Sequence, residues 1–185
     1  SLTGAIKDKV VLITGASSGI GKAAALKIAE AGAKTLIVAR TEEKLLETQR
    51  EIEARGGTAF IHTADVADIA SCDALIQQVL ADHGGVDILI NNAGRSIRRA
   101  IENSLDRFHD YERTMQLNYF GALRLIMGFI PSMLKKKRGH VINISSIGVL
   151  SNAPRFSAYV ASKAALDAFS RCAVAEFSDS GIDFT

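Results

Sequence analysis

The strongest constraint on the fold is a regular alternation of short, nearly all-apolar segments with longer amphipathic ones. The short segments predict buried β-strands at residues 9–14, 34–39, 58–63, 86–91, 140–145 and from 182 onward. The longer segments predict helices at residues 18–31, 41–55, 69–83, 111–137 and 157–180. Apolar strands separated by helices are typical of a parallel sheet that is covered on both faces. We therefore expect an α/β fold with a doubly wound parallel sheet.

Local signals refine the ends of these helices. Thr41 stands where it can cap the second helix, and two acids follow it in the first turn, where the helix dipole favours negative charge. In the long region 111–137, Gly128 and Pro131 predict a bend or an interruption. The sequence stops as the sixth strand begins, so we expect a single dinucleotide-binding domain, residues 1–185, that is incomplete at its C-terminus.

The composition excludes several classes of protein. With 185 residues, 48% hydrophobic and 23% charged, the chain matches one ordinary globular domain. A net charge of +2 gives no support for nucleic-acid binding. Cys72 and Cys172 are far apart, so we expect no disulfide framework and a reducing, cytoplasmic environment. We expect no metal site, because the four histidines lack the spacing of metal ligands.

We also expect no transmembrane segment. The most apolar stretch, residues 123–134, is too short and is interrupted by Arg124 and Pro131. The run 135–138 carries four basic residues, but it ends a predicted helix, where cations suit the dipole. We interpret this run as a solvated helix end.

A glycine-rich loop follows the first predicted strand. Its sequence is Thr14-Gly15-Ala-Ser17-Ser18-Gly19-Ile20-Gly21, and the next helix starts within it. Glycines let the backbone approach a pyrophosphate, and the helix N-terminus adds partial positive charge. The spacing differs from the commoner G-x-G-x-x-G, and the alternative is a glycine-rich turn without a ligand. The position between strand and helix favours a dinucleotide site.

The end of the second predicted strand bears on the choice of cofactor. An acid there would bind the ribose 2′-hydroxyl of NAD and repel the 2′-phosphate of NADP. This sequence has Ala39 and then Arg40, whose guanidinium can pair with a phosphate. The alternative is a solvated surface arginine. We predict NADP as the cofactor.

A tyrosine and a lysine form an i, i+4 pair near the start of the last predicted helix. Tyr159 and Lys163 therefore share one helical face, where an ammonium group stabilises a phenolate. Such a phenol can donate a proton to a carbonyl oxygen as hydride arrives. Ser145 and Ser146 end the fifth predicted strand, at the edge where open α/β sheets bind ligands. Alone, each feature is also compatible with an ordinary surface residue.

Together these motifs resemble the short-chain dehydrogenase/reductase family. The resemblance covers nearly the whole chain and includes the glycine loop, Asp65-Val66, Asn91-Asn-Ala93-Gly94, Asn118, and Ser146 followed by Tyr159-x-x-x-Lys163. It implies a Rossmann-type fold and an NADPH-dependent carbonyl reductase. The resemblance also implies a small-molecule carbonyl or alcohol substrate, and a homodimer or homotetramer.

The resemblance further implies roles for individual residues. Tyr159 would be the acid/base, Lys163 would assist it and bind the nicotinamide ribose, and Ser146 would polarise the substrate carbonyl. Asn118 would hold a water that links Lys163 to solvent. The implied cofactor-binding residues are Gly15, Ser17, Ser18, Gly19, Ile20, Gly21, Arg40, Asp65, Val66, Asn91, Ala93, Gly94, Tyr159 and Lys163. Within this set, Asp65 would contact the adenine and Asn91 would brace the fourth strand.

A narrower resemblance concerns three loops. Residues 91–99, 115–125 and 145–156 are similar to the reductase domain of bacterial multidomain fatty acyl-CoA reductases. This similarity implies a fatty aldehyde or acyl-CoA substrate. Two alternatives stay open: a non-catalytic dinucleotide sensor, and a nucleotide-sugar epimerase or dehydratase that uses the same tyrosine and lysine.

A few other residues were considered as site candidates. Arg95, Arg98 and Arg99 could meet a CoA phosphate or an acidic substrate, but a solvated loop is the simpler interpretation. We expect Cys72 and Cys172 to pack within helices, because neither has an obvious activating base.

Overall fold

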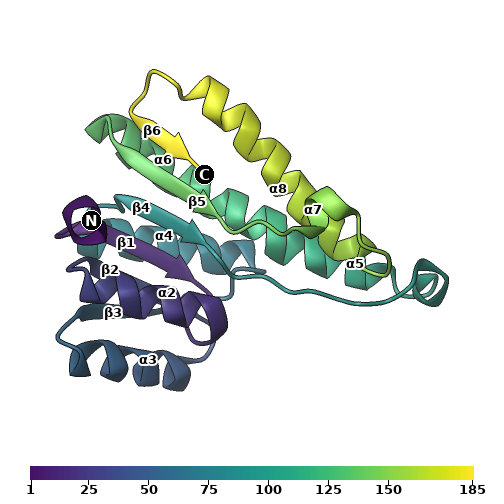
Figure 1. Ribbon diagram of the computed structural model, residues 1–185, viewed down its shortest axis with the longest axis horizontal. Helices are drawn as coiled ribbons and strands as arrows, with labels where there is room; N and C mark the ends of the chain where they lie inside the picture. Colours follow the sequence, from purple (N-terminus) through teal and green to yellow (C-terminus); the bar gives the residue numbers. More distant parts are fainter.

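A six-stranded parallel sheet forms the centre of the molecule (Figure 1). The computed structural model describes all residues, Ser1–Thr185. The strands are β1 (Val10–Thr14), β2 (Lys34–Ala39), β3 (Thr58–Thr63), β4 (Ile88–Asn91), β5 (Gly139–Asn143) and β6 (Ile182–Phe184). Their order is β3-β2-β1-β4-β5-β6. The chain adds β2 and β3 on one side of β1, then crosses over and adds β4, β5 and β6 on the other side, so the order reverses between the neighbouring strands β1 and β4. The predicted doubly wound fold is confirmed, and this reversal marks the expected ligand crevice.

Helices cover both faces of this sheet (Figure 1). They are α1 (Leu2–Ile6), α2 (Gly19–Glu30), α3 (Glu42–Ala54), α4 (Ile69–His83), the 3-10 helix η1 (Ile101–Ser104), α5 (Phe108–Met115), the π-helix η2 (Gln116–Gly121), α6 (Ala122–Lys136), α7 (Gly148–Ser151) and α8 (Ser157–Glu176). The sequence did not indicate the short elements α1, η1 and α7. Each is only four or five residues long, which is too short for a periodic pattern.

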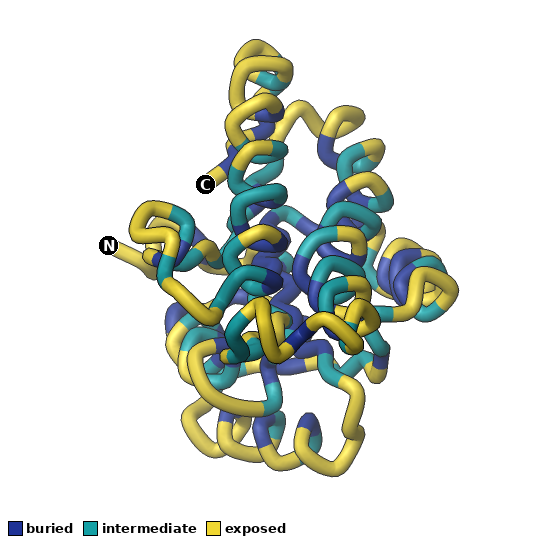
Figure 2. Tube along the Cα trace, turned by 90° about the vertical axis from the view of Figure 1, so that its right-hand side faces the viewer, coloured by how far each residue is buried: buried dark blue, intermediate teal, exposed yellow.

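Successive side chains of β1 point to opposite faces of the sheet, so they belong to two different apolar layers. Ile13 joins one cluster with Leu45 and Ile52 of α3, whereas Leu12 joins the other with Leu125 and Phe129 of α6. All six side chains are almost completely buried. Figure 2 shows buried residues gathered at the centre, with the exposed residues on the outer faces of the helices. This two-sided core fixes the sheet, and the loops at its carboxyl end are built on it.

The long helical region is interrupted at a different place from the one predicted. Residues 108–136 are continuously helical, and the irregular turn is the π-helix η2 rather than the segment around Gly128 and Pro131. Pro131 is accommodated on the exposed side of α6. At Gly128 a Cβ would collide with Ile76, so this glycine permits close packing between α4 and α6. The π-helix occurs where Gly121 lies against the backbone of Val66.

Several element ends also differ from the predictions. Strand β5 ends at Asn143, so Ser145 and Ser146 lie in the loop beyond it and not in the strand. Helix α8 ends at Glu176 and is followed by a turn, rather than reaching residue 180. Thr41 occupies the N-cap of α3 as expected, but its side chain makes no capping hydrogen bond.

The continuous helix over Phe108–Lys136 is 29 residues long and apolar enough, by length and composition alone, to cross a membrane. The most apolar stretch of the sequence, residues 123–134, is only part of this helix. In the fold, Leu125, Ile126, Phe129 and Met133 of this helix are fully buried against the sheet. One face of the helix therefore packs into the core, and 39% of its most apolar window is buried.

Candidate active site

The glycine loop after β1 needs glycine for two physical reasons. Gly15 has φ +65°, and a Cβ there would lie 2.9 Å from Asn92 Nδ2. At Gly21, in the first turn of α2, a Cβ would collide with the Gly15 carbonyl oxygen. The loop is therefore folded tightly on itself, and larger residues at these positions would open it.

Thr14 and Asn92 join this loop to the end of β4. The Thr14 hydroxyl accepts hydrogen bonds from the backbone N–H groups of Asn92 (3.0 Å) and Ala93 (2.9 Å). Asn92 Nδ2 donates to the carbonyl oxygens of Thr14 (3.0 Å) and Gly15 (3.3 Å). These two residues were not among the predicted site residues. The sequence did contain a sign of the role of Asn92, because a polar Asn directly after a buried strand requires hydrogen-bond partners.

The first turn of α2 can hold a pyrophosphate. The N-cap Ser18 makes no side-chain capping bond, so the first amides of the helix keep their hydrogen-bonding capacity. Gly19 has φ +55°, and a Cβ there would meet nothing within 4 Å. The first turn of α2 therefore forms a cradle for an anion. Space is open beside Gly19, Ser18 and Ile20 are exposed, and the helix dipole adds partial positive charge. The residues present therefore fit the diphosphate of a dinucleotide.

Two further predicted residues lie at the same edge of the sheet. Arg40 is exposed and directly follows β2. Asp65 follows β3, and its Oδ1 accepts a hydrogen bond from the Ala67 backbone N–H at 3.0 Å. Val66 is buried beneath Gly121. Because the strands are parallel, Arg40 and Asp65 flank the side of the glycine loop toward β3, where the adenosine half of a dinucleotide would lie.

Lys163 is the most unusual charged group in this region. It is 96% buried by accessible surface, and its Nζ donates to the Ile144 carbonyl oxygen at 2.7 Å. Burial lowers its pKa. Tyr159 lies one turn earlier on α8 and is half-buried. A Cβ on Gly94 would be 3.5 Å from Lys163 Nζ, so the loop after β4 passes directly beside this ammonium group.

Asn118, within the π-helix, connects that loop to α8. Its Oδ1 accepts from the Arg95 N–H at 2.8 Å, and its Nδ2 donates to the Arg95 carbonyl (2.9 Å) and to Ser162 Oγ (3.0 Å). Ser162 in turn donates to the Tyr159 carbonyl oxygen at 2.7 Å. The side chain of Asn118 is thus occupied in holding two segments together. Its implied role in binding a water stays a prediction, and sequence reasoning did not find Ser162.

Ser146 lies beside the first turn of α8. Its Oγ accepts from the Gly148 N–H at 3.1 Å, and a Cβ on Gly148 would lie 3.1 Å from Val160 Cγ2. The loop that carries Ser146 therefore packs against the residue next to Tyr159. Ser145 is exposed, whereas Ser146 is half-buried.

Asn91 braces the strand ends beneath these loops. Its Nδ2 donates to Asn143 Oδ1 at 2.9 Å, and Asn143 Nδ2 donates to Ser170 Oγ at 2.8 Å. The chain of bonds links β4 to β5 and β5 to α8. These bonds therefore join the strand ends to α8, the helix that carries Tyr159 and Lys163.

Comparison with known proteins agrees with this geometry. The family model described as short chain dehydrogenase matches residues 9–185. The chain belongs to this short-chain dehydrogenase family. A relative named fatty acyl-CoA reductase, from Acinetobacter baylyi, is 64% identical over 171 residues. That match covers 92% of this chain and 58% of the relative, so the chain spans little more than half of the relative's length.

Solved structures of the short-chain dehydrogenase fold include both cofactor types. A metagenomic short-chain oxidoreductase in complex with NADP has a TM-score of 0.92 and 34% identity, covering 97% of this chain and 81% of that one. An NAD⁺-bound xylitol dehydrogenase has a TM-score of 0.89 and 27% identity, covering 96% and 68%. The fold itself therefore does not distinguish the two cofactors, and local residues must do so.

Some residues that the sequence reading had set aside have defined environments in this short-chain dehydrogenase. We expected Arg99 to lie in a solvated loop, but it forms an ion pair with the buried carboxylate of Asp110. Arg95 and Arg98 are exposed. Cys72 is buried within α4 as predicted, but Cys172 of α8 is exposed rather than packed.

Two of the four histidines lie close together in the fold. His62 and His83 are 21 residues apart in the sequence, yet their Nε2 atoms lie 3.4 Å apart. Burial and the neighbouring His83 lower the pKa of His62, while Asp82 acts in the opposite direction. Spacing along the chain gave no sign of this pair, because one residue lies on a strand and the other ends a helix.

Proposed function

We propose that this chain is the catalytic part of an NADP-dependent oxidoreductase that transfers a hydride between nicotinamide and a carbonyl or alcohol substrate. The observation that carries the proposal is the buried ammonium group of Lys163, one turn from Tyr159 and next to Gly94 at the end of the sheet. A buried charge is costly and is retained where chemistry requires it. Family membership supports the same reaction class.

In the reduction direction, each of these side chains has a distinct task. When bound, NADPH would supply the hydride for the carbonyl carbon. The Tyr159 hydroxyl transfers its proton to the carbonyl oxygen, and the Lys163 ammonium stabilises the resulting phenolate. The Ser146 hydroxyl donates a hydrogen bond to the same oxygen and lowers the cost of its developing charge. Proton return to Tyr159 from solvent completes the cycle, and oxidation reverses these steps.

The proposed cofactor position follows the strand ends from β3 to β5. The cradle of Gly15, Ser17, Ser18, Gly19, Ile20 and Gly21 would hold the diphosphate. Asp65 and Val66 would face the adenine, and Arg40 the 2′-phosphate. Asn91, Ala93 and Gly94 would line the path to Tyr159 and Lys163. Arg40 stands where an NAD enzyme would usually have an acid, which supports NADP over NAD, and a similar short-chain oxidoreductase is an NADP complex.

A long-chain acyl-CoA or fatty aldehyde is the substrate class that we propose. The relative from Acinetobacter baylyi, at 64% identity, is named for fatty acyl-CoA reduction. The structure adds a set of exposed apolar side chains on segments beyond the strand ends, at the right of Figure 1: Ile101, Leu105, Phe108, Ile147 and Leu150. Their exposed fractions range from 63% to 81%, although large apolar side chains are usually buried. Apolar surface in this position suits an alkyl chain.

Replacing Tyr159 with Phe tests the proposed reaction. The ring keeps its packing, but the transferable proton is lost, so turnover of a long-chain aldehyde should fall by at least ~10²–10⁴-fold. NADPH binding, measured by fluorescence titration, should be nearly unchanged. Tyr119→Phe is the matched control, because this tyrosine packs edge-on against Phe120 outside the proposed site. Turnover within tenfold of wild type would show that Tyr159 is not the acid.

A panel of substrates separates the remaining alternatives. We expect NADPH oxidation with aldehydes or acyl-CoAs, and a KM that falls as the chain lengthens from four to sixteen carbons. A sensor would bind NADPH and turn over none of them. An epimerase or dehydratase would act on a nucleotide sugar without net consumption of NADPH. Either result would contradict the proposed reductase.

A further inference from the structure

Three side chains with metal-binding atoms meet outside the proposed active site. His62 lies near the end of the edge strand β3, while Asp82 and His83 end helix α4. One ligand atom from each lies within 4.8 Å of the other two. His62 and His83 are half-buried and Asp82 is exposed. None of the three belongs to the proposed cofactor or catalytic groups.

The separation of the two imidazoles matches a shared metal ion. Zn²⁺ binds His nitrogen at about 2.0–2.1 Å in tetrahedral geometry, which places two such ligands about 3.3–3.4 Å apart. The Nε2 atoms of His62 and His83 are 3.4 Å apart. A carboxylate is the third ligand type that Zn²⁺ accepts. Two imidazoles and one carboxylate leave the fourth position to water.

We propose that His62, His83 and Asp82 form a binding site for one divalent transition-metal ion, Zn²⁺ by ligand preference, that clamps the end of α4 to the edge strand β3. The chemistry of the ligands selects this class of ion. Imidazoles favour Zn²⁺ and its neighbours over Mg²⁺ and Ca²⁺, which need oxygen ligands.

Neighbouring contacts orient two of these ligands. The Phe60 ring packs edge-on against His83, with ring centroids 5.0 Å apart, and supports the imidazole from one side. Gln78 Nε2 donates to Asp82 Oδ2 at 2.7 Å, which leaves Oδ1 free for a metal. Outer hydrogen bonds of this kind are a usual feature of metal sites. The two imidazoles therefore already have the spacing of metal ligands, and the Asp82 carboxylate lies within 4.8 Å of both.

Metal titration of the purified, chelator-treated protein tests the site. We expect one equivalent of Zn²⁺ to bind by calorimetry, and Co²⁺ to give the strong visible absorption of a tetrahedral complex. Saturating Zn²⁺ should raise Tm by roughly 5 °C or more, because it binds only the folded state. His62→Ala and His83→Ala should each abolish the Co²⁺ spectrum and the shift in Tm.

Two further variants keep the test decisive. His140→Gln is the matched control: its imidazole forms a hydrogen bond with Thr185, far from β3 across the sheet, and the metal signals should be retained. Asp82→Asn changes an exposed residue, so it should fold normally and weaken Co²⁺ binding at least tenfold. The proposal is overturned if wild-type protein gives no tetrahedral Co²⁺ spectrum, or if His140→Gln loses the signal as His62→Ala does. The two histidines would then share only a hydrogen bond.

Discussion

Arg40 is the residue on which the proposed choice of cofactor depends. It is exposed at the end of β2, and Glu42 and Glu43 follow it in the first turn of α3. Ser17 and Ser18 offer no positive charge within the glycine loop, so Arg40 would bind the 2′-phosphate with little help. A charge-assisted contact of this kind contributes roughly 1.5–3 kcal/mol.

Arg40→Ala should therefore weaken NADPH binding by about tenfold to a hundredfold, since ~1.4 kcal/mol equals one decade in Kd. NADH binding should be nearly unchanged. The measurement is a pair of dissociation constants for each protein, with Arg50→Ala of α3 as the control. Equal weakening for both cofactors, or a wild-type preference for NADH, would show that Arg40 does not contact the 2′-phosphate.

The two cysteines should differ sharply in reactivity. Burial, with smaller contributions from nearby carboxylates, raises the pKa of Cys72 to about 11, whereas Cys172 is exposed on α8. Because the thiolate is the reactive form, iodoacetamide at pH 8 should label Cys172 at least tenfold faster than Cys72. Peptide mass spectrometry over a time course gives both rates. Similar rates would mean that α4 opens readily in solution.

At the scale of elements, Asp110 fixes the segment between β4 and α5. Arg107 Nε lies 2.8 Å from its carboxylate, and Arg99 pairs with the same oxygen. The Arg99 N–H donates to the Arg155 carbonyl oxygen at 2.7 Å, which ties the segment to the start of α8. Hydrogen bonds from Arg107 and then Arg99 lower the pKa of Asp110 to about 2.

This lowered pKa makes a prediction about stability and pH. The ionised form contributes stability above the ordinary value of 3.8, and the contribution is lost as the pH falls toward 2. Asp110→Asn should therefore lower Tm at pH 7, and the difference from wild type should shrink below about pH 4. Thermal unfolding from pH 7 to pH 3 measures it, with exposed Asp106→Asn as the control. A difference that stays constant down to pH 3 would contradict the charge-based explanation.

The elements differ in how far the sequence alone could predict them. Strand-helix alternation predicted every strand and every long helix, because burial on a sheet leaves a local pattern of apolar residues. The π-helix could not be predicted, since its partners are Val66 and Arg95, far from Asn118 in the chain. The same holds for Thr14 with Asn92 and for His62 with His83. Contacts between distant segments follow from the topology, and no local pattern records them.

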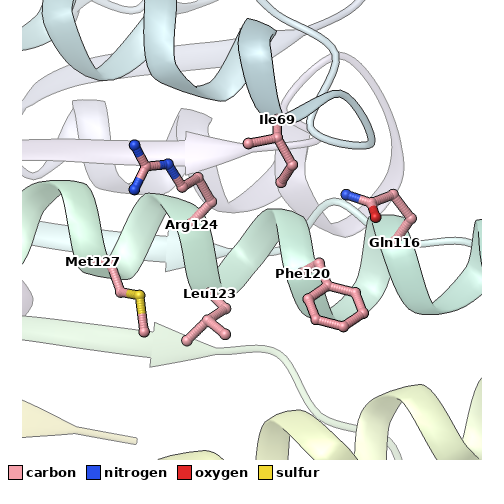
Figure 3. A pocket seen from close by; sticks show the side chains of 6 residues that line it. All are labelled: Ile69, Gln116, Phe120, Leu123, Arg124 and Met127. Carbon is pink, nitrogen blue, oxygen red and sulfur yellow. The ribbon is translucent and has the colours of Figure 1, made fainter.

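At the scale of the whole molecule, the outer face of η2 and α6 is unusually apolar. Figure 3 shows Phe120, Leu123 and Met127 pointing to one side of this helix, and together with Ile69 at the start of α4 they line one pocket. Phe120 is 47% exposed and Met127 is 54% exposed. Apolar surface of this kind is typical of an interface between subunits.

We therefore expect a dimer or tetramer that uses this face. Light scattering at micromolar concentration should give a multiple of the chain mass, and Met127→Glu should shift the distribution toward the monomer. Leu2→Glu, which changes a residue that is 53% exposed on α1, should leave the mass unchanged. A wild-type monomer at these concentrations would reject the expectation.

The bonds from Asn92 to the glycine loop have a consequence for synthesis on the ribosome. Asn92 Nδ2 and the Gly15 carbonyl oxygen belong to residues 77 positions apart. At roughly 5–20 residues per second, about 4–15 seconds separate the translation of one from the other. During that interval the nascent chain carries a complete strand, loop and helix without the amide that holds the loop closed. The loop is therefore closed only after translation has passed β4, so a closed cradle for the cofactor forms only once the first four strands have been made.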